Sequence, residues 1–171
     1  MGNLTVLALR VVLAVLLAGS VFVQTVMLPI VAIDMRDMNP AISYARVPFI
    51  VITLLGIVSV QVILACVWRL VTMVRRGTVF SHKAFRYVHT VIGALVAAAG
   101  LTFAMAVLLA STNHHVPGDA VAPGIVLLIC GAVVAILGVA LIVLVLRMLL
   151  AQAIARDIEA TRMKAELDGV I

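Results

Sequence analysis

The sequence predicts an all-α integral membrane protein, a four-helix bundle of up-down topology with both termini in the cytoplasm. Three observations support this fold class: long stretches without Asp, Glu, Lys or Arg, a composition that is 65% hydrophobic and only 11% charged, and an uneven placement of the basic residues. A hydrocarbon core about 30 Å thick needs about 20 helical residues to cross it. The uncharged stretches that meet this length are residues 11–33, 47–68, 87–118 and 120–146.

The spanning segments are expected to be helices. Lipid offers no partners for backbone N–H and C=O groups, so a spanning segment must be a helix or part of a closed barrel. Barrel strands alternate apolar and polar residues over about 10 positions, whereas these stretches are continuously apolar. We therefore expect a single membrane domain over residues 1–171, with a cytoplasmic amphipathic tail at about 148–171. The expected spans are about 11–33, 47–68, 87–110 and 124–146.

The basic residues fix the expected orientation. In an alternating four-span layout, the side that holds both termini and the middle loop carries ten Lys or Arg residues, and the opposite side carries only Arg36 and Arg46. Cytoplasmic segments of membrane proteins carry the excess of Lys and Arg. This placement explains the net charge of +5 without a nucleic-acid partner. The ten residues are Arg10, Arg69, Arg75, Arg76, Lys83, Arg86, Arg147, Arg156, Arg162 and Lys164.

Prolines and small residues give expectations about helix shape and packing. Pro29 predicts a mild kink at the outer end of the first span, and Pro48 is expected in the first turn of the second. Glycine and alanine recur at helical spacing in the last two spans, and small residues allow membrane helices to approach closely. We expect these faces to form the seam of the bundle, with a homodimer interface as the alternative. They carry Gly93 with Ala97, Gly100 with Ala104, and Gly131 with Ala135 and Gly138.

Three polar residues inside the spans are candidate intramembrane contacts: Gln24, Ser59 and Gln61. Counted along the helix axes from the span centres, Gln24 and Gln61 differ in depth by about 8 Å. We therefore expect each glutamine to bond a backbone carbonyl or a hydroxyl such as that of Ser59, and not the other glutamine. Interhelical contacts of this kind contribute about 0.6 kcal/mol on average.

The sequence offers little that resembles catalytic or metal chemistry. It has no phosphate loop, nucleophile elbow, zincin motif or paired carboxylates, so we expect neither an enzyme nor a cofactor. Cys66 and Cys130 differ in depth by about 20 Å and cannot form a disulfide bond. His114, His115 and Asp119 share one loop and are expected to be solvated and not to hold a metal ion.

The middle loop carries a family resemblance. Residues 75–81, Arg-Arg-Gly-Thr-Val-Phe-Ser, resemble the Gly-x-x-Phe-Ser signature of a bacterial four-span family called domain of unknown function 2975, and the acidic, apolar-ended tail 153–171 is similar to the terminus of that family. Where many members carry Asn shortly after the Ser, this chain has His82 and Lys83. The resemblance implies a bacterial inner-membrane protein with no established activity, often encoded near a small helix-turn-helix regulator.

Together these observations favour a non-enzymatic interaction or sensory component that acts with a cytoplasmic regulator. The alternative is a small transporter or pore for an uncharged or hydrophobic solute, which needs Gln24, Ser59, Gln61 and Thr102 to line a continuous path. The tail carries Leu150, Ile154, Ile158 and Ala165 on one stripe, and it is either a solvated helix end lying on the membrane or a docking surface. The candidate partner-contact residues are Arg75, Arg76, Gly77, Phe80, Ser81, Ile154 and Ile158.

Overall fold

The computed structural model describes residues 3–35, 43–75, 82–112 and 121–168, and all of its regular elements in these ranges are helices. The chain begins with α1 (Asn3–Phe22), which passes through a π-helical segment, η1 (Val23–Met27), into α2 (Leu28–Asp34). Three long helices follow: α3 (Ser43–Arg75), α4 (His82–Thr112) and α5 (Pro123–Asp168). The expected all-helical fold class is confirmed.

Four stretches of these helices are long and apolar enough to cross a membrane. Each one contains one of the ranges expected from the sequence, and the last extends well beyond it. The protein is therefore a multi-pass membrane protein. The four stretches are Val6–Asp34, Tyr44–Met73, Arg86–Thr112 and Pro123–Met163.

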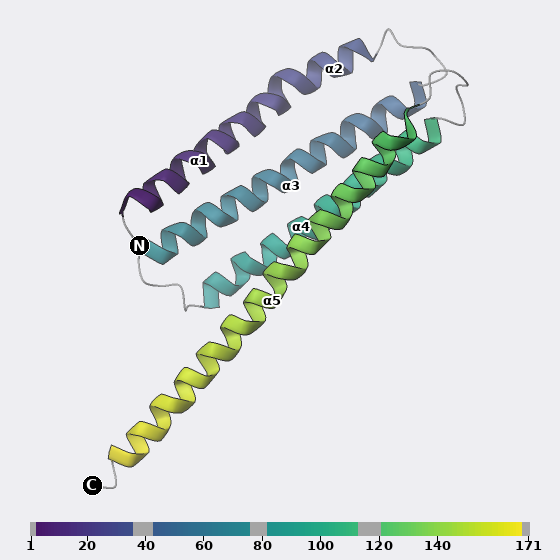
Figure 1. Ribbon diagram of the computed structural model, residues 1–171. Helices are drawn as coiled ribbons and strands as arrows, with labels where there is room; N and C mark the ends of the chain where they lie inside the picture. Colours follow the sequence, from purple (N-terminus) through teal and green to yellow (C-terminus); the bar gives the residue numbers. More distant parts are fainter. Residues whose placement is uncertain (1–2, 36–42, 76–81, 113–120, 169–171) are drawn as a thin grey trace.

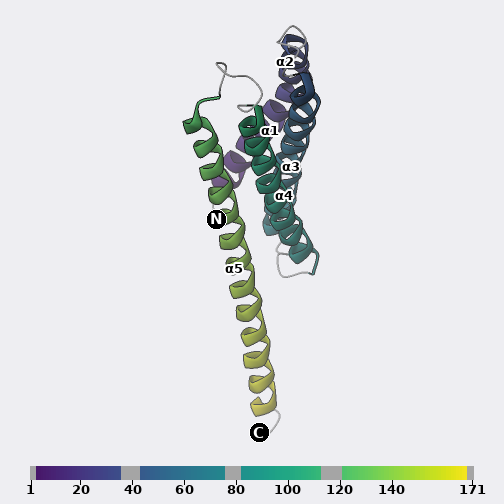
Figure 2. The same cartoon turned by 90° about the vertical axis from the view of Figure 1, so that its right-hand side faces the viewer.

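Consecutive helices run antiparallel and pack in chain order (Figure 1). Helix α3 packs against α1 and α2 and also against α4, which in turn packs against α5. The start of α1, the end of α3 and the start of α4 lie at one end of the molecule, and α5 continues far past that end (Figures 1 and 2). Both chain ends therefore leave the spanning region from the same end, which we call the terminal end.

Little of the protein is buried inside itself. The large apolar side chains of the spans are mostly exposed, as expected for helices that face lipid tails. Most of the buried residues have small side chains. Among the described residues they are Leu13, Ala45, Cys66, Val91, Ala99, Ala106 and Ala140.

The predicted small-residue seam is wrong. In α4 the buried alanines are Ala99 and Ala106, each 2% exposed, whereas Gly93, Ala97 and Gly100 are exposed. A Cβ atom added at any described glycine of the spans would meet no atom within 4 Å apart from its chain neighbours and the nearby backbone of its own helix. Alanine and glycine occur on several faces of these helices, so their spacing alone does not identify the face that packs.

One prediction about proline positions also needs correction, and the region around Pro29 shows an additional feature. Helix α3 starts at Ser43, four residues before the expected start of its span, so Pro48 lies inside the helix and not in its first turn. At the first span, the helical pattern changes before Pro29, in the π-helical segment Val23–Met27, where the Leu28 N–H donates to the Val23 carbonyl. Such an extra-residue turn, followed by a proline that lacks a donor, is a recognised cause of local helix distortion.

Candidate functional site

Three contacts between polar side chains of different helices are the natural places to look for a site. Arg10 of α1 contacts Thr72 of α3, Gln24 of η1 contacts Gln61 of α3, and His89 of α4 contacts Arg147 of α5. The first and third lie toward the terminal end of the spans, and the second lies deeper in the membrane region.

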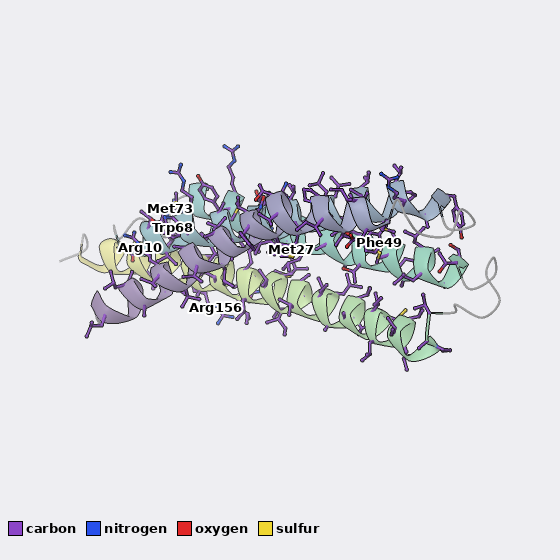
Figure 3. The ribbon with its side chains drawn as sticks, turned by 90° about the horizontal axis from the view of Figure 1, so that it is seen from above. Arg10, Met27, Phe49, Trp68, Met73 and Arg156 are labelled. Carbon is purple, nitrogen blue, oxygen red and sulfur yellow. The ribbon has the colours of Figure 1, made fainter. Side chains whose placement is uncertain are left out.

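Arg10 is held by a short chain of hydrogen bonds. An Nη atom of Arg10 donates to the Thr72 hydroxyl at 3.1 Å, and that hydroxyl donates to the carbonyl of Trp68 at 2.9 Å. The Nε atom of Arg10 is enclosed by protein and has no hydrogen-bond partner. Figure 3 shows Arg10, Trp68 and Met73 at the same end of the molecule. The guanidinium group is thus positioned by α3 while part of its hydrogen-bonding capacity is unused.

Sequence reasoning missed the Arg10 contact because the first span was started at the first residue after the charge. The helix begins at Asn3, and the apolar span begins at Val6, so Arg10 lies inside it. The apolar residues before Arg10 were the signal: Leu4, Val6, Leu7, Ala8 and Leu9 extend the hydrophobic stretch past the charge.

Gln24 and Gln61 bond to each other directly, so the expectation that they lie at different depths was wrong. The Gln61 Nε2 atom donates to Gln24 Oε1 at 2.8 Å, and both side chains are half-buried. The depth estimate assumed that the centres of the two uncharged stretches lie level. The register is instead set by a pairing that extends through Arg10 and Thr72, outside those stretches. It brings the two amides together between α3 and the π-helical segment.

The other candidate polar groups bond within their own helices. Ser59 donates to the carbonyl of Leu55 at 2.9 Å, and Thr102 donates to that of Ala98 at 2.8 Å. Each hydroxyl therefore donates its hydrogen bond to the carbonyl four residues earlier in its own helix, a common arrangement in membrane helices. The groups that a polar transport path would need are separated into one interhelical pair and isolated local bonds.

His89 lies near the terminal end of the α4 span and contacts Arg147 of α5. An Nη atom of Arg147 lies 3.4 Å from His89 Nδ1, and the His89 side chain is exposed. The contact places Arg147 at the same level as the beginning of α4. About 21 residues of α5, from Met148 to Asp168, therefore continue beyond this level as one helix, a length of about 30 Å.

The apolar residues of this α5 extension, residues 148–168, are largely uncovered. Ile158 is 54% exposed, and Ile154 is half-buried. Further exposed apolar side chains on the extension are Met148, Leu149, Leu150 and Met163. Arg156, Glu159 and Arg162 are exposed between them, so the surface combines apolar groups with charges of both signs.

Several sequence candidates lie outside the described residues. The loop residues Arg76, Gly77, Phe80 and Ser81 are among them, as are His114, His115 and Asp119, and Arg75 is described only as the last residue of α3. Within the described ranges, no group of three or more His, Cys, Asp or Glu residues could hold a metal ion. Cys66 and Cys130 are both free thiols.

Comparison with known proteins identifies the family. The family model described as "Protein of unknown function (DUF2975)" matches residues 30–171, which is most of the chain. The chain belongs to the DUF2975 family. No curated protein and no solved structure matched it. The DUF2975 match covers Gln61, Thr72, His89 and Arg147, whereas Arg10 and Gln24 precede it, so two of the three interhelical contacts join the matched region to the first helix.

Proposed function

We propose that this protein is a non-enzymatic interaction or sensory component of the bacterial inner membrane, which contacts a soluble cytoplasmic regulator through the α5 extension. The observation that carries the proposal is the continuity of α5. The helix leaves the spanning region without a break and stays straight in both views (Figures 1 and 2). An extension in line with its span projects away from the bilayer, whereas a helix lying on the membrane needs a bend at the interface.

The surface of the extension supports the same proposal. Ile158 is exposed, with Arg156, Glu159 and Arg162 exposed around it. A partner suited to this surface offers an apolar groove for a helix, with polar groups of both signs at its rim. Docking of an amphipathic helix into such a groove is a general mode of recognition between proteins.

The orientation rests on charge. The terminal end of the described helices carries Arg10, Arg69, Arg86 and Arg147, and the positive-inside rule places such an end in the cytoplasm. The extension then lies in the same compartment as a soluble regulator. The family resemblance led us to consider a helix-turn-helix protein as this regulator, and a second copy of the chain is the competing partner.

The experiment is site-specific photo-cross-linking in native membranes. A photoreactive residue replaces Ile158, and two controls use the same helix. Ala160 is exposed about 200° around the helix from Ile158, and Val134 is 70% exposed within the span. We expect a protein adduct at Ile158, a much weaker one at Ala160 and lipid adducts alone at Val134.

The outcomes separate the alternatives. An adduct to a soluble DNA-binding protein that disappears when Ile154→Asp is added to the chain carrying the probe at position 158 supports the proposal. Lipid adducts at Ile158 that match those at Val134 would show an extension lying on the bilayer and would overturn it. An adduct of twice the mass of the chain would assign this surface to a homodimer and would overturn the regulator as partner.

A further inference from the structure

Among the described residues, no carboxylate pairs with the charge of Arg10. Its guanidinium group donates to a neutral hydroxyl, that of Thr72, and its Nε atom is enclosed and unpaired. The sequence of α3 and α4 contains no Asp or Glu at all, and the nearest acidic residue on the first helix, Asp34, is about 36 Å away along the axis. The carboxylates of α5 begin at Asp157, about 15 Å beyond Arg147. An anion from outside the chain would supply the charge that these helices do not provide beside Arg10.

The surroundings of Arg10 match the chemistry of a phosphate group at the membrane surface. Arg69 lies three residues before Thr72 on α3, and residues at this spacing are neighbours about 5–6 Å apart on a helix surface. The Arg69 side chain is exposed, and Arg10 is half-buried. Trp68, whose carbonyl orients Thr72, belongs to the residue type that concentrates at the headgroup level of a bilayer.

We propose that Arg10 and Arg69 bind the phosphate of an anionic phospholipid in the leaflet at the terminal end, where α1 packs against α3. Guanidinium groups bind phosphate through paired, charge-assisted hydrogen bonds. Thr72 holds Arg10 in one position and so reduces the ordering that binding requires. Basic sites between membrane helices are known to recognise lipid headgroups. The bound lipid supplies the charge that the helices lack.

The test uses the full-length purified protein and native mass spectrometry with defined lipids. Phosphatidylglycerol, phosphatidylcholine with the same acyl chains, and soluble glycerol phosphate are added in turn. We expect phosphatidylglycerol to be retained preferentially and Arg10→Gln to lower its retention about tenfold, because a charge-assisted pair is lost. The control Arg162→Gln removes the same charge from an exposed position on the α5 extension and should change retention by less than about twofold.

A second variant keeps the charge and removes its positioning. Thr72→Val takes away the hydroxyl that accepts from Arg10, so we expect weaker lipid retention at unchanged net charge. Circular dichroism will show whether Arg10→Gln folds. If it does not, the lipid retention of Thr72→Val tests the proposal in its place.

Three results would overturn the proposal. Retention of phosphatidylglycerol by Arg10→Gln at the level of the wild type would remove the role of Arg10. An equal loss of phosphatidylglycerol retention in Arg10→Gln and Arg162→Gln would show that the net charge of the protein attracts the lipid and that Arg10 forms no specific site. Binding of glycerol phosphate as tight as that of the lipid would make a soluble phosphate, and not the bilayer, the source of the anion.

Discussion

The hydrogen bond between Gln24 and Gln61 gives the sharpest prediction about how the first helix is held. The two amides join η1 to α3 at 2.8 Å. Replacement of either glutamine by leucine keeps a similar side-chain size and leaves the other amide without its partner. Replacement of both removes the unpaired group, so the double variant should be more stable than the sum of the two single changes indicates.

The expected magnitude follows from the environment of the pair. Interhelical hydrogen bonds in membranes contribute about 0.6 kcal/mol on average and at most about 1.7 kcal/mol. Both glutamines are half-buried, which leaves each a route to other partners and favours the lower part of that range. We therefore expect a coupling free energy of about 0.6–1 kcal/mol between Gln24 and Gln61.

A double-mutant cycle measures this coupling by reversible unfolding in mixed micelles. The control cycle combines Gln24→Leu with Thr53→Val, because the Thr53 hydroxyl donates to the Phe49 carbonyl of its own helix at 2.8 Å. That cycle should show additivity within about 0.3 kcal/mol. A coupling between Gln24 and Gln61 no larger than that of the control would refute the direct pair and the register that it defines.

Three further predictions concern packing. Ala99→Leu should destabilise the protein by about 1–3 kcal/mol in micelle unfolding, because its site on α4 is 2% exposed. Ala97→Leu, on the exposed face of the same helix, should change the stability little. Equal losses of stability in the two variants would contradict the assigned packing face. Gly100→Ala should be neutral or stabilising by up to about 1 kcal/mol, because the added Cβ meets no atom within 4 Å, and a loss of stability would restore the small-residue seam. Leu13→Ala should weaken the packing of α1 on α3 and raise the rate of proteolysis in the first helix, whereas the exposed Leu16→Ala should not; identical proteolysis of the two variants would argue against this contact.

The number and approximate position of the helices follow from the sequence because their cause is local. A continuous apolar stretch in lipid must be helical, whatever its neighbours are. The ends of the helices were harder to predict from the sequence. Helix α3 begins at Ser43 and includes Arg46, because a charged side chain near the interface does not end a helix.

The contacts between helices could not be read from residue spacing. Gln24 and Gln61 meet because α1 pairs with α3 in a register that extends to Arg10 and Thr72, which is a property of two helices and not of either sequence alone. The seam of α4 at Ala99 and Ala106 was missed for a similar reason. Several faces of that helix carry small residues, and the choice among them depends on its partners.

Cysteine accessibility in intact and permeabilised cells tests the central claim, that four spans bring both chain ends to the cytoplasmic face. In a background without Cys66 and Cys130, single cysteines replace Leu4, Met163 and Ala122, all exposed and placed near the start of α1, on the α5 extension and just before α5. The account predicts that a membrane-impermeant reagent labels position 122 in intact cells and positions 4 and 163 only after permeabilisation. Labelling of positions 4 and 163 from opposite sides of the membrane would contradict it.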